Sequence, residues 1–173
     1  MRRVAVIIGF AVLLLYGCNG KGPQRPSQRI GEAPQVDSSQ LALLKLNQQL
    51  ANAADDQLAQ IAHQQAESYA LYDANAWVHI IDRGDEDSAT PQPGEEWMIR
   101  MRVLDLNEHL LMDSEQTYLL GKHKLPRAID LNIGELHHGG KARMFVPWYS
   151  AFGLQGTEEI PPYTNVIIEI ELR

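Results

Sequence analysis

The chain has very little cysteine and no excess of basic residues. Its one cysteine, Cys18, excludes a disulfide within the chain and a zinc site built from several thiolates. Asp and Glu number 22 against 15 Lys and Arg, which gives a net charge of −7. Nucleic-acid binding depends on basic residues that neutralise phosphates, so we expect no nucleic-acid partner. With 173 residues, 45% of them hydrophobic, the chain suffices for one globular domain.

Motifs for nucleotide-dependent, nucleophilic or metal-dependent catalysis are also missing. The pair Gly139-Gly140 lacks the strand, glycine-rich turn and helix of a nucleotide site. Ser150 lacks the flanking glycines of a hydrolase nucleophile. His137 and His138 are adjacent, so their side chains point apart, which favours a solvated turn over a metal site. We therefore expect neither a cofactor nor a metal, and a function that uses no reactive side chain.

The N-terminus has the pattern of an export signal. Two arginines precede the apolar residues 4–15, which are too few to span a bilayer core of ~30 Å as a helix. The run ends in Leu-Tyr-Gly before Cys18 and resembles the lipobox of bacterial lipoproteins, in which the cysteine is acylated. Asn19 is typical of lipoproteins passed to the outer membrane, so we expect a lipid anchor there, facing the periplasm. A general signal peptide with an incidental cysteine is the alternative.

The next segments change from coil to helix. Residues 19–36 combine proline and glycine with no apolar periodicity, as in a solvated tether. From Leu43 to Tyr72, apolar residues recur with a period near 3.6, and weak helix formers at residues 52–56 could divide this helix. Its apolar stripe can pack on the domain that follows, on its own second half, or on a second copy of the chain. The last alternative would make residues 40–72 a dimer interface.

After Trp77 the apolar periodicity shortens toward two, which is typical of strands. We expect an α+β fold, in which an antiparallel sheet wraps around one short helix at residues 128–136. The expected strands cover residues 77–81, 97–104, 110–112, 117–120, 142–147 and 166–172. The expected organisation is a signal peptide at 1–17, a tether at 18–36, a helical segment at 37–73 and a domain at 74–173.

Several short motifs occur in a fixed order near the C-terminus. They are a Leu-Gly step, a helix end with Gly-Gly-Lys-Ala, Ala-Phe-Gly, Ile-Pro-Pro and a final strand with alternating acids, at residues 119–122, 136–142, 146–153, 160–162 and 166–172. They resemble the FKBP-type peptidyl-prolyl cis-trans isomerase domain. Residues 77–107 are similar to the lipid-anchored, gliding-motility-associated branch of that family. The resemblance implies an FKBP-like half-barrel around the short helix.

The resemblance also implies a function, that of an envelope folding catalyst acting on extended, proline-containing polypeptides. Rotation of a peptide bond meets a barrier of ~18–20 kcal/mol because twisting destroys the amide resonance. An apolar pocket favours the twisted, less polar amide, so catalysis needs no nucleophile, acid or metal. The alternative is a non-catalytic FKBP-like chaperone or partner-binding lipoprotein.

Matching the family's motifs residue by residue implies the members of the site. Those with a catalytic role are Asp113, Leu125, Ile129 and Phe152, and those that bind substrate are Met112, Gln116, Pro126, Ile160 and Ile168.

Some of these positions depart from the family. Ile129 stands where the family has its floor tryptophan, Phe152 replaces a tyrosine, and Arg102 falls on a tyrosine of the preceding strand. Pro126 falls where a backbone N–H binds the substrate carbonyl, and proline has no N–H to donate. A shift by one residue would give that role to Leu125. The apolar members could also be ordinary core residues.

Overall fold

The structure, a computed structural model, describes residues 37–122 and 124–173. Residues 38–173 form one unit by their internal contacts. No helix among the described residues is both long and apolar enough to span a bilayer. The predicted signal peptide, Cys18 and the tether lie outside the described residues and stay predictions.

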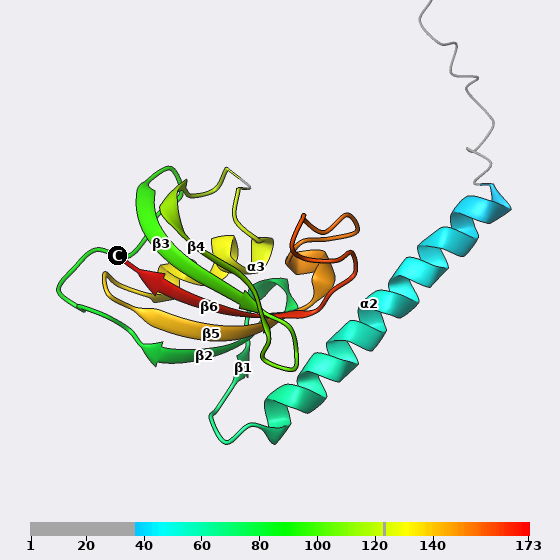
Figure 1. The fold of residues 1–173 in the computed structure, drawn as a ribbon, viewed down its shortest axis with the longest axis horizontal. Helices are drawn as coiled ribbons and strands as arrows, with labels where there is room; N and C mark the ends of the chain where they lie inside the picture. Colours follow the sequence, from blue (N-terminus) through cyan, green and yellow to red (C-terminus); the bar gives the residue numbers. More distant parts are fainter. Residues whose placement is uncertain (1–36, 123) are drawn as a thin grey trace, which may run out of the picture. The chain divides into compact units, whose positions relative to one another are not determined.

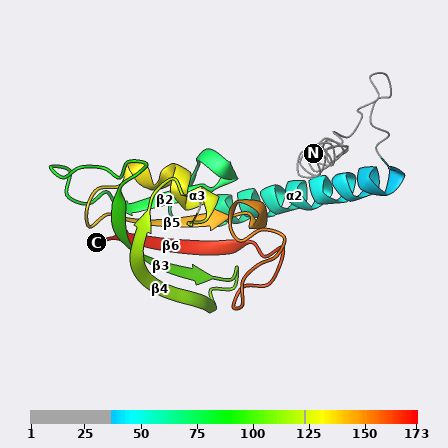
Figure 2. The ribbon, with the colours of Figure 1, turned by 90° about the horizontal axis from the view of Figure 1, so that it is seen from above.

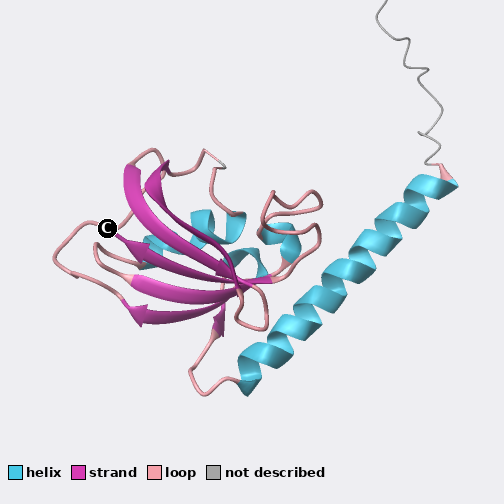
Figure 3. Cartoon of the chain, in the orientation of Figure 1, coloured by secondary structure: helices cyan, strands magenta, loops and turns pink. Residues whose placement is uncertain are grey.

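Six strands form one antiparallel sheet, in the order β1-β2-β5-β6-β3-β4. Figures 1 and 2 show β2, β5, β6, β3 and β4 side by side in this order. One long helix and several short helical segments accompany the sheet (Figure 3), which confirms the predicted α+β class. The strands are β1 (Ala70–Leu71), β2 (Trp77–Asp82), β3 (Glu96–Leu104), β4 (Leu110–Leu119), β5 (Lys141–Val146) and β6 (Val166–Leu172).

One face of the sheet carries the short helix α3 (Arg127–Asn132), and we call it the inner face. Ala128 and Ile129 of α3 belong to the main core cluster, together with Val103 of β3 and Ile168 of β6. Side chains alternate along a strand, so the residues next to these point to the opposite, outer face.

The outer face receives the second half of the long helix α2 (Ser38–Gln64). Leu58 and Ala62 of α2 belong to a second core cluster, so this half of the helix packs on the domain. The first half presents exposed leucines, with Leu43 60% and Leu46 49% exposed. The sheet members of the second cluster are Leu104, Phe145 and Ile167.

The helix ends earlier than the sequence predicts. The apolar spacing predicts a helix as far as Tyr72, but α2 ends at Gln64 and continues unbroken through residues 52–56. Tyr69 lies beyond it and packs on Phe145, with ring centroids 4.7 Å apart. Its helical spacing is therefore incidental, because it reaches the outer face from an extended segment.

The sheet domain differs from the prediction at two places. β4 is one strand, although the polar residues 113–116 suggest a break between two. These residues point alternately to the two faces of the sheet, but all four are polar, so the sequence shows no alternation of apolar and polar residues there. The helix predicted over residues 128–136 consists of α3 followed by a 3₁₀ turn, Ile133–Glu135.

A hydrogen-bonded triad holds α2 against the domain. The Tyr149 hydroxyl donates to Asp55 of α2. The Asn75 side-chain amide donates to the Tyr149 hydroxyl at 2.8 Å and to Asp55 at 3.1 Å. Burial, followed by the hydrogen bond to Asp55, raises the pKa of Tyr149 from 10.0 to about 12.

We predict that the domain loses stability between pH 10 and 12 through Tyr149. Below pH 10 the phenol is protonated in both the folded and the unfolded state, and the contact with Asp55 contributes fully. Between the two pKa values only the unfolded phenol ionises, so the free energy of unfolding falls. Tyr149→Phe should lower that free energy by about 0.5–1.5 kcal/mol at neutral pH and flatten its alkaline decline. Urea unfolding followed by tryptophan fluorescence measures both; equal alkaline slopes for the two proteins contradict the prediction.

Candidate functional site

The apolar residues implied by the resemblance lie together on the inner face. Leu125, Ile129, Ile160 and Ile168 belong to the main core cluster, and Met112 and Phe152 pack against it. They come from β4, α3, β6 and the loops that precede α3 and β6.

Members of this group differ in their accessibility. Ile129, Ile160 and Ile168 are each 0% exposed, so they form the floor beneath the surface. Met112 and Phe152 are half-buried, so they are the apolar side chains of the group that a ligand can touch without any rearrangement. The accessible surface is therefore formed by one flexible thioether and one aromatic ring.

Pro126 has a structural role in this arrangement. It is the N-cap of α3, and its carbonyl accepts hydrogen bonds from the amides of Ile129 and Asp130 at 2.9 and 3.1 Å. Proline suits this position because its φ is fixed and a helix start leaves its first N–H groups without partners anyway. The preceding amide, that of Leu125, has no hydrogen-bond acceptor among the described residues. It therefore remains a donor that a ligand carbonyl could use.

Leu125 also lines a cavity of about 460 Å³. It is lined by Leu125 and Leu131, together with the charged residues Arg127 and Asp130 of α3. Asp130 is already engaged, because its carboxylate accepts a hydrogen bond from the amide of Gly121 at 3.0 Å. The cavity gives space next to Leu125, on the α3 side of the site.

Gln116 contacts Tyr118, a residue that the sequence did not identify as part of the site. Its side-chain amide donates to the Tyr118 hydroxyl, and Tyr118 is 5% exposed in the main core cluster. Between Gln116 and Met112, the hydroxyl of Ser114 is buried without a hydrogen-bond partner among the described residues. Every second residue of β4 faces inward, so unbroken alternation from Met112 would have identified Ser114 and Tyr118.

The structure does not bring Asp113 to the other site residues. Asp113 directly follows the inner-face residue Met112, so its side chain lies on the outer face. There its carboxylate pairs with Arg100 at 3.2 Å and with Arg102 at 4.0 Å. The hydrogen bond from Arg100, with the charge of Asp113, raises the pKa of that guanidinium.

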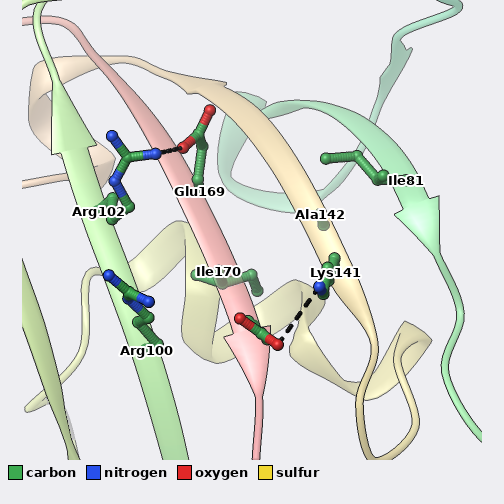
Figure 4. Close-up of a pocket in the computed structure, with 8 residues that line it drawn as sticks. Ile81, Arg100, Arg102, Lys141, Ala142, Glu169 and Ile170 are labelled. Atoms are coloured by element: carbon green, nitrogen blue, oxygen red, sulfur yellow. Dashed lines mark hydrogen bonds and ion pairs between the residues drawn. The ribbon is translucent and has the colours of Figure 1, made fainter.

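Arg102, which falls on a family tyrosine by sequence, also lies on the outer face. Its guanidinium donates to Glu169 of β6 at 2.7 Å, and Lys141 pairs with Glu171 at 3.4 Å (Figure 4). These groups line a cavity of about 330 Å³ that contains Arg100 as well. Its charged groups are all in ion pairs, Arg100 with Asp113 and the others with one another, so it offers no dry surface to a prolyl ring.

No metal site is found in residues 37–122 and 124–173. A cluster of at least three His, Cys, Asp or Glu side chains in a metal-binding arrangement is absent from this part of the chain. His137 contacts the Ser88 carbonyl through Nδ1 at 2.8 Å, so it is occupied within a loop contact.

Comparisons with known proteins find similarity only in structure. No family model matches the chain, and no curated protein matches it. A peptidyl-prolyl cis-trans isomerase from Pseudomonas syringae pv. tomato superposes with a TM-score of 0.59 at 16% identity, over 72% of this chain and 92% of that chain. FkpA from Escherichia coli gives a TM-score of 0.60 at 14% identity, over 78% of this chain and 63% of that chain. The N-terminal domain of FKBP42 from Arabidopsis thaliana gives 0.53 at 20% identity, over 63% of this chain and 92% of that chain.

The fold is FKBP-like. Identities of 16%, 14% and 20% show the fold alone, and the chain covers 63% of FkpA. The candidate site of this FKBP-like domain is therefore described by its own inner face, with Met112 and Phe152 above the isoleucine floor.

Proposed function

We propose that the FKBP-like domain is a peptidyl-prolyl cis-trans isomerase acting on X-Pro bonds of extended polypeptides. The observation that carries the proposal is the half-buried pair Met112 and Phe152 on a fully buried floor of isoleucines. The similar structure from Pseudomonas syringae, described as a peptidyl-prolyl isomerase, supports the same activity.

The proposed mechanism uses contact and exclusion of water. A proline ring placed on the inner face contacts the apolar side chains accessible there, among them Met112 and Phe152, and lies away from the charges of the outer face. There the planar amide loses part of its solvation, and the twisted amide, which is less polar, loses less. The Leu125 amide is the donor for a substrate carbonyl, since Pro126 has none. Ile129 supplies floor area in place of an aromatic ring, so we expect modest turnover.

The activity is tested with an acyl-free chain of residues 18–173 carrying Cys18→Ser. We expect Phe152→Ala to lower kcat/KM for a Leu-Pro peptide by about tenfold, because it removes most of the accessible aromatic contact. Met98→Ala is the matched control: Met98 is 45% exposed and lies on the outer face of β3, so its loss should leave the rate unchanged.

A protease-coupled isomerisation assay gives the rate, and chemical-shift titration with the same peptide gives binding. Peptide binding without acceleration would replace the isomerase by a non-catalytic, polypeptide-binding module. The absence of both binding and acceleration would remove the inner face as a ligand site.

We further propose that the protein acts at the outer membrane, facing the periplasm, through a lipid on Cys18. The support is the lipobox-like sequence before Cys18. Acyl chains contribute ~0.8 kcal/mol per buried CH₂, so two or more give a stable anchor.

Replacing Cys18 by serine should move the protein from the membrane fraction to the soluble fraction, because it removes the site of acylation. Fractionation of cells that produce the two full-length forms, followed by immunoblotting, checks this. Replacing the neighbouring Asn19 by serine is the control and should leave the protein with the membranes. Membrane association of the Cys18→Ser form would exclude the lipid anchor.

Finally, we propose that the first half of α2 forms a homodimer interface. Leu43, Leu46 and Leu50 are spaced by three and four residues and are 60%, 49% and 39% exposed. A solvent-exposed apolar stripe of this kind is typical of a helix that packs against a partner.

Sedimentation of the acyl-free chain should show a dimer, and Leu46→Glu should convert it to a monomer because the charge would be buried in the interface. Gln48→Glu, at an exposed position on the opposite side of the same turns, is the control. A wild-type monomer at all concentrations would exclude the interface.

A further inference from the structure

The edge of the sheet next to the candidate site is formed by β4. β4 pairs with β3 and with no other strand of the described structure, so one side of its backbone is unpaired there. At ten residues it is the longest strand of the sheet. Long, uncovered edges are what sheets present to an added strand.

The hydrogen bonds at the ends of the neighbouring strand show which amides face outward. The Leu120 amide donates to the Glu95 carbonyl, and the Arg173 amide of the β6 end donates to the Met98 carbonyl, both at 2.9 Å. Hydrogen-bonded and non-hydrogen-bonded residue pairs alternate along two antiparallel strands. Either bond, extended along the β3–β4 register, shows that the backbone N–H and C=O groups of Met112, Ser114 and Gln116 face β3. The outward N–H and C=O groups therefore belong to Asp113, Glu115 and Thr117. None of these has a backbone hydrogen-bond partner among the described residues.

The alternation of inward and outward backbone groups along β4 determines where a proline fits in an added antiparallel strand. Residues directly opposite each other share a face and are either both bonded or both unbonded. A residue opposite Asp113, Glu115 or Thr117 must donate its N–H and has its side chain on the outer face. A residue opposite Met112 or Ser114 has its side chain on the inner face and its nitrogen turned away from β4. Proline, which has no N–H, is therefore tolerated only with its ring on the inner face.

The charges of the edge indicate the composition of the added strand. Glu115 points to the outer face opposite Arg100 of β3, whose guanidinium pairs with Asp113, and Glu115 forms no salt bridge of its own with any described residue. A basic residue directly opposite it would make a favourable cross-strand pair. Leu110, 52% exposed, adds apolar surface at the start of the strand.

We propose that the β4 edge binds an extended client polypeptide as an additional antiparallel strand, with its proline on the inner face beside Met112. The proposal rests on the proposed prolyl isomerase function, and it specifies how the client is held: backbone hydrogen bonds to Asp113, Glu115 and Thr117, and a basic client residue opposite Glu115. The register restricts the client's proline to the face that carries Phe152, whereas its other residues can occupy either face.

The test uses the acyl-free chain and a nine-residue synthetic peptide with a central Leu-Pro and flanking lysines. On binding, hydrogen exchange of the Asp113, Glu115 and Thr117 amides should slow by about tenfold or more. The amides of Met112, Ser114 and Gln116, which already bond to β3, should change little. Peptide binding or isomerisation without this alternating protection would overturn the edge proposal and leave the isomerase proposal standing.

Matched N-methylated peptides test the same pairing from the client side. Methyl groups on the amides next to the proline, at odd offsets, should weaken binding by about tenfold or more, because those amides donate to β4. Methyl groups at even offsets, which point away, should change affinity less than about twofold. Equal losses for the two peptides would contradict the proposal.

Three further outcomes separate the alternatives. Glu115→Lys should weaken the lysine-flanked peptide and strengthen a glutamate-flanked one; no change in this preference would overturn the charge assignment. Protection of the same amides without peptide, rising with protein concentration, would assign the edge to a second copy of the chain instead. Alternating protection with no acceleration would support the edge site while removing the isomerase.

Discussion

The structure depends on the strict alternation of side chains across strands whose two faces are covered to different extents. At one end of β6, Val166, Ile167 and Ile168 are all buried, because α3 covers the inner face and α2 covers the outer face. Further along, Glu169 and Glu171 alternate with buried residues, because no helix of the described residues covers the outer face there. The same strand therefore changes from a continuous apolar run to an alternating one where the contact with α2 ends.

That alternation explains how much of the fold and the site the sequence could predict. β6 has the predicted bounds, since its apolar residues mark one face throughout. Asp113 directly follows Met112, but its carboxylate lies on the opposite face with Arg100, because one position along a strand changes the face. The end of α2 was missed because Tyr69 satisfies a helical spacing while packing from an extended segment onto Phe145. Long-range contacts of this kind leave no local signal in the chain.

Each charged residue of the outer face contributes little to the free energy of unfolding. Arg102 and Arg143 share Glu169 at 2.7 and 3.1 Å, at a partly exposed surface where single ion pairs contribute little. Their main effect is to place charge on the outer face, while the inner face beside Met112 stays apolar. A ligand that needs a dry surface and a ligand that needs charge would therefore bind to opposite faces of the same strands.

α2 is also connected to the candidate site, because it is hydrogen-bonded to the segment that joins β5 to β6. Near the start of this segment Tyr149 donates to Asp55 of α2, and near its end Asn165 donates to Gln57 of α2 at 3.0 Å. Asn165 also accepts a hydrogen bond from the Trp148 amide at 3.0 Å, which ties the two ends together. Phe152 lies between them and follows Tyr149 by three residues. The helix that leads toward the N-terminus therefore fixes both ends of the loop that supplies the accessible aromatic ring, so any loosening of α2 widens the range of positions open to that ring.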